Sequence, residues 1–297
     1  MPVVSVIIPS YNYADYIGRA IDSVLSQSFH DLEIIVVDDA STDNTHGVID
    51  QFNDQRIFYI RHEVNQGPNA ARNTGILHSR GSLLAFLDSD DFWMPDKLKL
   101  QIEYFNHGSA NLGAVFTGIK IFDKHTNQYN VLTNEDNIAY GLKDILRGNL
   151  LGSSSAIIHA RCFKTLGLFD TTMRYCEDWD NWIRIAAHFE IGYLRQVLVE
   201  CSRHSGNISL NRHGILAGRA IILKKHRTVF LLYPDIFCKH HYVLGLEFYK
   251  DGFINKGREH FLTAFKYAPV NNMLKFKSFI RYCMTIMYFK TEKPYEK

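Results

Sequence analysis

The sequence is poor in cysteine and contains no long apolar run. Its 297 residues include five cysteines, an odd number, and no pair at CxxC spacing, so neither a disulfide framework nor a zinc site is expected. No run of 18 apolar residues occurs, and the N-terminus lacks a basic stretch followed by an apolar core. These absences predict a cytoplasmic protein with reduced thiols, without a signal peptide or a membrane-spanning helix.

Two common nucleotide-binding signatures are also missing. The first predicted strand, residues 3–9, is not followed by a GxGxxG motif. The P-loop motif, GxxxxGK followed by Ser or Thr, does not occur in the sequence. This weakens the hypotheses of a dehydrogenase and of a P-loop protein. A nucleotidyltransferase would need a clamp of basic residues for a triphosphate, and none follows the first strand. We expect no nucleic-acid partner.

Charge is distributed unevenly along the chain. Residues 203–297 carry 17 Lys and Arg against 6 Asp and Glu, whereas residues 1–202 carry 16 against 25. A basic tail on an acidic body predicts contact with an anionic partner such as a phospholipid surface. The alternative is that the tail docks on the acidic body itself.

Three carboxylates follow one strongly apolar segment. Residues 83–87 read as a buried strand, and Asp88, Asp90 and Asp91 come directly after it. Carboxylates repel one another and resist desolvation, so their crowding at a strand tip favours a Mn²⁺ or Mg²⁺ site. A polar turn before the helix that begins near Pro95 is the alternative.

Strands and helices alternate through the first hundred residues. Strands are predicted at residues 3–9, 32–39, 57–60 and 83–87, with the first ending at Pro9, and helices lie between them. Short connections of this kind predict a mostly parallel sheet with helices on both faces, and ligands bind beyond the carboxyl ends of such strands. The polar residues that follow these strands are therefore expected at one edge.

Four motifs in this part resemble the family 2 glycosyltransferases of the GT-A fold. They cover roughly residues 3–210 and consist of VSVIIPSYN from Val4, VDDASTD from Val37, NQG from Asn65 with ARNTG from Ala71, and FLDSDD from Phe86. The resemblance implies an α/β GT-A domain that binds a nucleotide-diphosphate sugar, with uridine the expected base. One departure is Ala40, where the family usually has Gly.

The resemblance also implies roles for individual residues. The nucleotide sugar would be bound by Pro9, Tyr11, Asn12, Asp39, Asn65, Arg72, Asp88, Ser89 and Asp90. The metal, Mn²⁺ or Mg²⁺, would be held by Asp90, Asp88 and His204. Without the family, Arg72 reads as a surface helix residue, Tyr11 as a packing residue and His204 as a solvated loop residue.

A second acidic pair lies near the middle of the chain. Glu177 and Asp178 begin a segment whose apolar residues follow helical spacing, and spacing alone explains them as acids at a helix N-terminus. The resemblance instead implies that Asp178 is the general base of an inverting single displacement. Trp179 and Trp182 are expected in the core or stacked on sugar rings.

The tail is predicted to be helical. Residues 213–232 read as one long helix, and residues 238–271 match the spacing of one tetratricopeptide-like hairpin, or else a generic helical hairpin. A single repeat cannot bury its own face, so the tail is expected to pack on the catalytic domain, on a partner or in a homodimer. Residues 272–290 form a basic amphipathic segment that would either lie on a membrane or be buried on the body.

Together these patterns predict a catalytic domain at residues 1–212 and a helical tail at residues 213–297. The domain divides into a nucleotide-binding half, residues 1–107, and an acceptor-side half, residues 108–212. We expect a metal-dependent, inverting hexosyltransferase of surface polysaccharide synthesis. It would transfer the sugar of a UDP-sugar to a hydroxyl of a glycan or lipid-linked acceptor. It would be peripheral at the inner face of the cell membrane. The alternatives are a non-catalytic nucleotide-sugar-binding or adaptor module and a nucleotidyltransferase.

Overall fold

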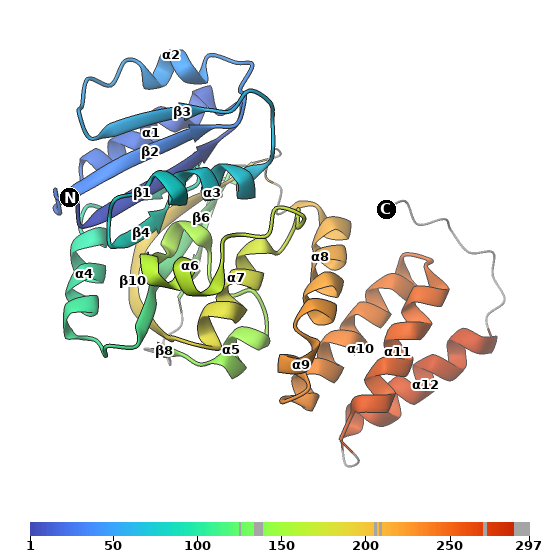
Figure 1. The fold of residues 1–297 in the computed structure, drawn as a ribbon. Coiled ribbons are helices and arrows are strands. Elements are labelled where there is room, and N and C mark those ends of the chain that lie inside the picture. Colours follow the sequence, from blue (N-terminus) through green and yellow to red (C-terminus); the bar gives the residue numbers. More distant parts are fainter. Residues whose placement is uncertain (125, 134–138, 205–206, 208–209, 270–271, 288–297) are drawn as a thin grey trace. The chain divides into compact units, whose positions relative to one another are not determined.

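The chain forms two compact units, Met1–Asn211 and Arg212–Lys297. The structure is a computed structural model that describes residues 1–297 except 125, 134–138, 205–206, 208–209, 270–271 and 288–297 (Figure 1). The first unit contains the sheet, and the second is built from helices.

A mixed sheet forms the centre of the first unit. Its strand order is β3-β2-β1-β4-β9-β6-β10-β5, with β7 paired to β6 and β8 paired to β10. β1 runs parallel to β2 and β4, and β2 runs parallel to β3, as the alternating pattern predicts. The strands are β1 (Val4–Ser10), β2 (Leu32–Asp38), β3 (Ile57–Arg61), β4 (Leu83–Phe86), β5 (Phe92–Trp93), β6 (Leu112–Asp123), β7 (Gln128–Leu132), β8 (Ala139–Tyr140), β9 (Ile157–His159) and β10 (Glu190–Arg203).

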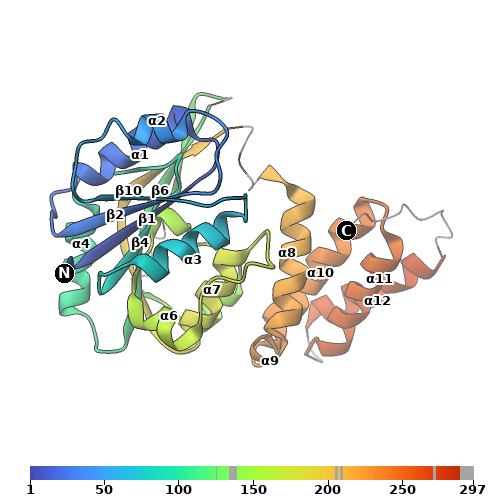
Figure 2. The same ribbon diagram turned by 45° about the horizontal axis from the view of Figure 1, so that its top comes forward.

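Helices cover both faces of this sheet (Figure 2). Alternate residues of β1 and β2 pack in one cluster with α1 and α2, and the intervening residues Ile35 and Val37 pack with Ala71 of α3 on the other face. On that face, a Cβ at Gly75 would lie 2.4 Å from Ile7, so only glycine allows α3 to approach β1 this closely. The helices of this unit are α1 (Ala14–Leu25), α2 (Thr45–Ile49), α3 (Pro68–His78), α4 (Lys97–His107), α5 (Leu142–Leu146), α6 (Ala160–Leu166) and α7 (Glu177–Ala186), with a 3₁₀ turn η1 (Ser153–Ser155).

The first strand extends beyond Pro9, so the prediction that it ends there is wrong. β1 continues to Ser10, and Pro9 stays in register with Val37 of β2. Pairing with β4 stops at Ile7, whose carbonyl points toward that side and accepts from Leu87. Residues two apart in a strand point the same way, so the nitrogen of Pro9 faces the β4 side. The pairing with β4 has already ended there, so no hydrogen bond is lost by the missing N–H of Pro9.

Residues 123–136 are polar and rich in turn-forming residues, which predicts a loop, but part of this segment is a strand. β6 is continuous through Asp123 and pairs with β7, a strand of exposed residues. Residues 125 and 134–138 lie outside the described part of the chain.

The second unit contains α8 (Arg212–Lys225), α9 (Arg227–Phe230), α10 (Pro234–Lys250), α11 (Ile254–Tyr267) and α12 (Met273–Met287). The single long helix expected at residues 213–232 is two helices, because the backbone at His226 leaves the helical region with φ −100° and ψ 24°. The hairpin is present: a Cβ at Gly245 would lie 2.7 Å from Phe261, so small residues let α10 and α11 approach closely. No helix in the described residues is long and apolar enough to cross a membrane.

Two half-buried histidines join the helices of the hairpin. Nδ1 of His241 in α10 lies 2.8 Å from Nδ1 of His260 in α11, and their rings contact Phe237 and Phe248. Burial lowers the pKa of His241 to about 3 and that of His260 to about 4. The pair is therefore neutral in the folded hairpin at neutral pH, one ring donating to the other.

Acid should destabilise the hairpin through this pair. Because both folded-state pKa values lie below that of a free histidine, the stabilisation is complete above about pH 6.5 and is lost as the pH falls toward 4. We expect the melting temperature to fall between about pH 7 and about pH 5, and to fall less in His241→Leu/His260→Leu. Thermal unfolding at both pH values measures this, with exposed His107→Leu as the control. Equal acid sensitivity of the double variant and the wild type would contradict the assignment.

Candidate functional site

The carboxyl ends of β1, β2 and β4 meet at one edge of the sheet. β2 and β4 flank β1 and run parallel to it. The main-chain N–H of Asp39 donates to the Ser10 carbonyl at 2.8 Å, and Ser89 Oγ donates to the Pro9 carbonyl at 2.5 Å. The structure thus brings the three polar strand ends together, as parallel neighbours require.

Asp39 lies at this edge with 2% of its surface exposed, and its carboxylate accepts hydrogen bonds from the protein. The main-chain N–H groups of Gln66 and Gly67 donate to it at 2.9 and 2.6 Å, and His62 Nδ1 lies at 2.7 Å. Asp39 therefore organises the loop before α3. Since a carboxylate has about four lone-pair positions, roughly one remains for a ligand.

Asn12 also has a partner within the protein. Its Oδ1 accepts from the main-chain N–H of Thr42 at 2.7 Å, which fastens the loop after β1 to the loop after β2. Its φ of 58° is left-handed, a conformation that Asn tolerates. Tyr11, at 42% exposed, and Asn65 present their side chains to solvent. Both are accessible for stacking or hydrogen bonding to a ligand.

Ala40 retains the turn that a glycine would form. Its φ is 65°, in the left-handed region that glycine adopts freely, so an alanine here carries a strain of about 1 kcal/mol.

The three carboxylates after β4 have different surroundings. Asp91 points inward and accepts from Ser154 Oγ at 2.5 Å and from the Ser202 N–H at 3.3 Å. The side chain of Asp88 is 36% exposed and that of Asp90 is 9% exposed. Burial, followed by the charge of Asp88, raises the pKa of Asp90, and burial raises that of Asp91 well above its usual value. Asp88 and Asp90 are thus the carboxylates placed for a ligand, while Asp91 anchors the turn.

His204 comes from beyond β10 and reaches Asp90. Its Nε2 lies 3.0 Å from Oδ2 of Asp90, and its ring stacks on Tyr16 at 5.0 Å between centroids. Asn207 donates to the same oxygen at 2.9 Å. Burial, and then the charges of Asp90 and Asp88, raise the pKa of the nearby Tyr13, which therefore remains protonated. The structure thus places His204 beside the acidic turn, while its role as a metal ligand stays a prediction.

Arg72 joins the acidic turn to the second acidic pair. Its side chain is 7% exposed, and its guanidinium donates to Asp88 at 2.8 Å and to Glu177 at 3.2 Å. Burial alone would lower the pKa of Arg72, but the charges of Asp88 and Glu177 hold it above its usual value. The reading of Arg72 as a surface helix residue is excluded, because this cation is buried between two carboxylates that lie far apart in sequence.

Glu177 and Asp178 occupy the first turn of α7, as predicted. Asn149 Nδ2 donates to both carboxylate oxygens of Asp178 at 2.9 Å. Burial, and then the charge of Asp178, raise the pKa of Glu177 to about 7, and burial also raises the pKa of Asp178. Cys176, just before them, adopts a left-handed φ of 60°, a strained conformation of the kind found near functional sites.

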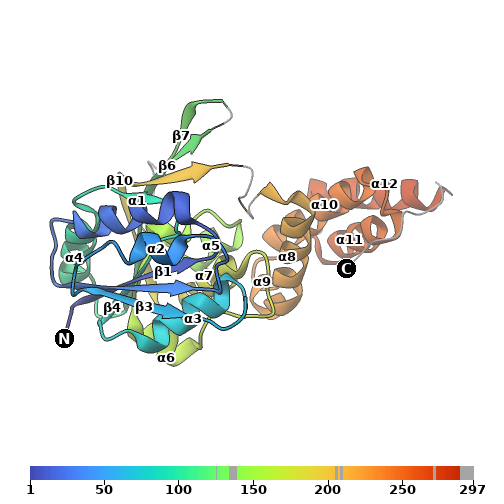
Figure 3. The ribbon, with the colours of Figure 1, turned by 90° about the horizontal axis from the view of Figure 1, so that it is seen from above.

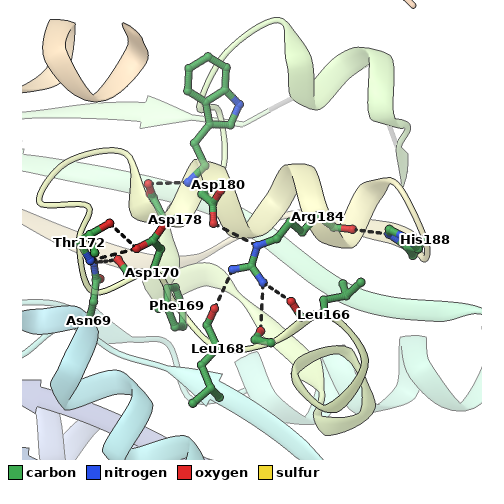
Figure 4. A network of polar contacts seen from close by, with 12 residues as sticks. Asn69, Leu166, Leu168, Phe169, Asp170, Thr172, Asp178, Asp180, Arg184 and His188 are labelled. Atoms are coloured by element: carbon green, nitrogen blue, oxygen red, sulfur yellow. Dashed lines mark hydrogen bonds and ion pairs between the residues drawn. The ribbon is translucent and has the colours of Figure 1, made fainter. Parts of the chain in front are cut away.

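The rest of α7 is fixed to its surroundings (Figure 4). Arg184 pairs with Asp180 at 3.0 Å and donates to the main-chain carbonyls of Leu166 and Leu168. Trp179 and Trp182 are 1% and 0% exposed, so they belong to the core and do not stack on sugars. Asp178 therefore projects from a rigid element, which favours precise positioning of a reacting group.

Ser154 of η1 is a site residue that the sequence did not single out. Its Oγ donates to Asp91 and accepts from the main-chain N–H of Asp88 at 3.1 Å, and its carbonyl accepts from Trp93 Nε1 at 2.8 Å. A serine 66 positions away from Asp88 gives no local signal. Asn149 and Asn207 were missed for the same reason.

Replacing Ser154 should loosen the acidic turn. Ser154→Ala leaves the buried carboxyl of Asp91 without its closest partner, and we expect a loss of about 1–3 kcal/mol in the free energy of unfolding. Urea unfolding measures it, with Ser154→Thr, which keeps the hydroxyl, as the matched variant. A loss for Ser154→Ala no larger than that for Ser154→Thr would show that the hydroxyl does not hold the turn.

The predicted metal ligands do not form a cluster of three in this structure. Asp90 meets His204 while Asp88 turns to Arg72, and no group of three His, Cys, Asp or Glu among the described residues has metal-binding geometry. Mg²⁺ usually binds through one or two carboxylates together with substrate phosphates and water. The raised pKa of Asp90, due to burial and to Asp88, shows acid crowding that a cation would relieve. The residues fit such an ion, and the metal stays a prediction.

A hollow of about 560 Å³ lies away from these residues. It is lined by α1, α2 and the β5 region, including Arg19, Phe52 and Trp93. It is not part of the candidate site.

Comparison with known proteins identifies the family. Residues 5–163 match Glycosyl transferase family 2, and the chain belongs to that family. It is 31% identical over 218 residues to the glycosyltransferase RP339 of Rickettsia prowazekii, covering 71% of this chain and 68% of the relative. It is 29% identical over 253 residues to the Escherichia coli UDP-Glc:alpha-D-GlcNAc-diphosphoundecaprenol beta-1,3-glucosyltransferase WfaP, covering 80% and 94%. The protein is therefore a glycosyltransferase, which sets aside the nucleotidyltransferase and adaptor alternatives.

Solved structures agree on the fold. S. aureus TarS residues 1–349, in complex with UDP-GlcNAc, superposes with a TM-score of 0.72 at 18% identity, covering 96% of this chain and 89% of that chain. The likeness confirms the predicted GT-A fold with its helical extension.

Proposed function

We propose that this glycosyltransferase moves a sugar from a UDP-sugar to a hydroxyl group, with the help of Mn²⁺ or Mg²⁺. The observation that carries the proposal is the chain of contacts from Asp88 through Arg72 to Glu177, beside Asp178. It connects carboxylates suited to a metal–diphosphate with a carboxylate suited to proton removal. The similarity to TarS, which was solved with UDP and with UDP-GlcNAc, supports a uridine donor.

The donor half of the site would lie at the shared strand edge. Tyr11 and Asn65 are accessible for the base and ribose, and the remaining acceptor position of Asp39 suits the imide N–H of uracil. Pro9, Asn12 and Ser89 would shape this edge through their bonds to neighbouring loops.

Asp88 and Asp90, with His204, would hold the cation, which when bound stabilises charge on the leaving diphosphate. Arg72 keeps a full positive charge beside them.

The acceptor half would use Asp178 as the general base. As the acceptor hydroxyl passes its proton to Asp178, its oxygen bonds to the anomeric carbon. The bond from that carbon to the diphosphate oxygen breaks at the same time. The raised pKa of Asp178, caused chiefly by burial, improves its match to a base working near neutral pH. A single displacement inverts the anomeric centre. Glu177 is held by Arg72 and would position this pair.

The acceptor would be a glycan or a lipid-linked sugar. WfaP is named for a diphosphoundecaprenol-linked acceptor, and its match extends over 94% of its length. We propose a role in surface polysaccharide synthesis at the cytoplasmic side of the membrane, with the enzyme in peripheral contact with it. Homodimerisation through the tail is a separate proposal, which sedimentation velocity tests.

A thermal-shift screen of nucleotide sugars tests the donor class. With Mn²⁺ present, UDP-sugars at about 100 times Kd should stabilise the fold by about 2.7 kcal/mol, whereas CMP- and GDP-sugars should not. Equal shifts from all three bases, or shifts only from CMP- or GDP-sugars, would overturn the uridine assignment.

A further inference from the structure

Helix α12 has one apolar face that the described residues of its own unit leave uncovered. Met273, Phe276 and Ile280 follow each other at spacings of three and four, so they share one side of the helix, and they are 70%, 67% and 41% exposed. On the other side, Ser278 and Thr285 are 0% and 3% exposed. The helix packs along α11 and also touches α10 (Figure 3). In the described part of the second unit, α12 is therefore attached by one side only.

The same surface is basic. From His260 to Met287 the sequence contains Lys266, Lys275, Lys277 and Arg281 and not one Asp or Glu. Lys277 is exposed and lies next to Phe276 on the uncovered side, and Arg281 borders it one turn further along. Apolar side chains flanked by basic ones are typical of helices that lie in a membrane interface.

We propose that the α12 face, defined as Met273, Phe276, Lys277 and Ile280, binds the surface of an anionic phospholipid bilayer. Met273, Phe276 and Ile280 enter the boundary of the acyl chains, and Lys277 with Arg281 meets the lipid phosphates. The helix lies in the plane of the membrane, because a segment of this length and charge does not span it.

Charge decides between a bilayer and a second copy of the chain. Two α12 faces brought together would place Lys277 and Arg281 of each copy near like charges, with no acid in the helix to pair with them. An anionic lipid surface attracts the same residues, each of which contributes about a fivefold gain in binding near the surface. Vesicle binding needs no nucleotide or acceptor, so failure of this inference leaves the proposed transfer reaction intact.

Co-sedimentation of the full chain with lipid vesicles tests the inference. We expect binding to vesicles of phosphatidylcholine mixed with phosphatidylglycerol, weak binding to pure phosphatidylcholine, and loss of binding as salt is raised. Phe276→Ser/Ile280→Ser should weaken binding by at least about tenfold, and Lys277→Glu by at least about fivefold.

Matched controls come from the same unit. Leu232→Ser removes an apolar side chain that is 72% exposed outside α12, and Lys239→Glu reverses an exposed charge on α10; neither should change binding. Equal binding to both kinds of vesicle, no binding to either, or loss of binding in the controls as well would overturn the proposal. If the α12 variants instead convert a dimer to a monomer in sedimentation velocity, the face is a contact between copies.

Discussion

Asp178→Asn should lower kcat by about 10²- to 10⁴-fold while leaving UDP affinity unchanged, because it removes proton acceptance and keeps the size of the side chain. The site supports a selective effect, since the Trp179 N–H and Asn149 already hold this side chain by hydrogen bonds that an amide oxygen can also accept. Arg72 and Glu177 lie between Asp178 and the turn that carries Asp88. Transfer rates at saturating UDP-sugar, with UDP titration by calorimetry, separate the two effects.

Asp144→Asn provides the control for this prediction. Asp144 forms an exposed ion pair with Arg147 on α5, and its loss should leave kcat unchanged. If Asp178→Asn retains kcat within a few-fold of the wild type, another group removes the proton and the base assignment is wrong.

Arg72→Met should lower the free energy of unfolding by about 3–5 kcal/mol, because it leaves Asp88 and Glu177 facing each other without the cation between them. The deficit should depend on pH. Arg72 opposes the burial that raises the pKa of Glu177 to about 7, so removing it raises this pKa further. A carboxyl whose folded-state pKa is raised favours folding below its unfolded pKa and opposes it as the pH rises, so the loss should be larger at about pH 8 than at about pH 6.

Denaturant unfolding at the two pH values measures this, with Arg147→Met as the control. Arg147 is 58% exposed, and loss of its pair with Asp144 should cost less than about 1 kcal/mol at either pH. If Arg72→Met loses no more free energy of unfolding than Arg147→Met, the Arg72 guanidinium does not hold the two acidic pairs together.

Much of this arrangement could be predicted from sequence because it depends on local patterns. The buried run at residues 83–87 followed by acids, and the helical spacing after Asp178, fix a strand end and a helix start. The spacing that predicts the helical hairpin includes Gly245 and Gly257, and a Cβ added at Gly257 would lie 3.0 Å from the Gly245 carbonyl oxygen. Each of these sequence patterns lies in the same helix or strand as the residue that it positions, or in the next one.

The rest depends on contacts between distant segments. Ser154, Asn149 and Asn207 are single polar residues in loops or short turns, and only the folded sheet brings them to Asp88, Asp178 and Asp90. The sequence also could not show that the Asp39 carboxylate would accept hydrogen bonds from the loop before α3. Two of these donors are main-chain N–H groups, which every non-proline residue has. The break at His226 was missed because apolar periodicity continues across it.

The most direct test of the account is calorimetric titration of UDP, with and without Mn²⁺, into the wild type and Asp90→Ala. If acidic strand ends meet in order to hold a cation and a diphosphate, Mn²⁺ should strengthen UDP binding to the wild type, and Asp90→Ala should remain folded but lose that gain. Unchanged, metal-independent UDP affinity in both proteins would contradict the account.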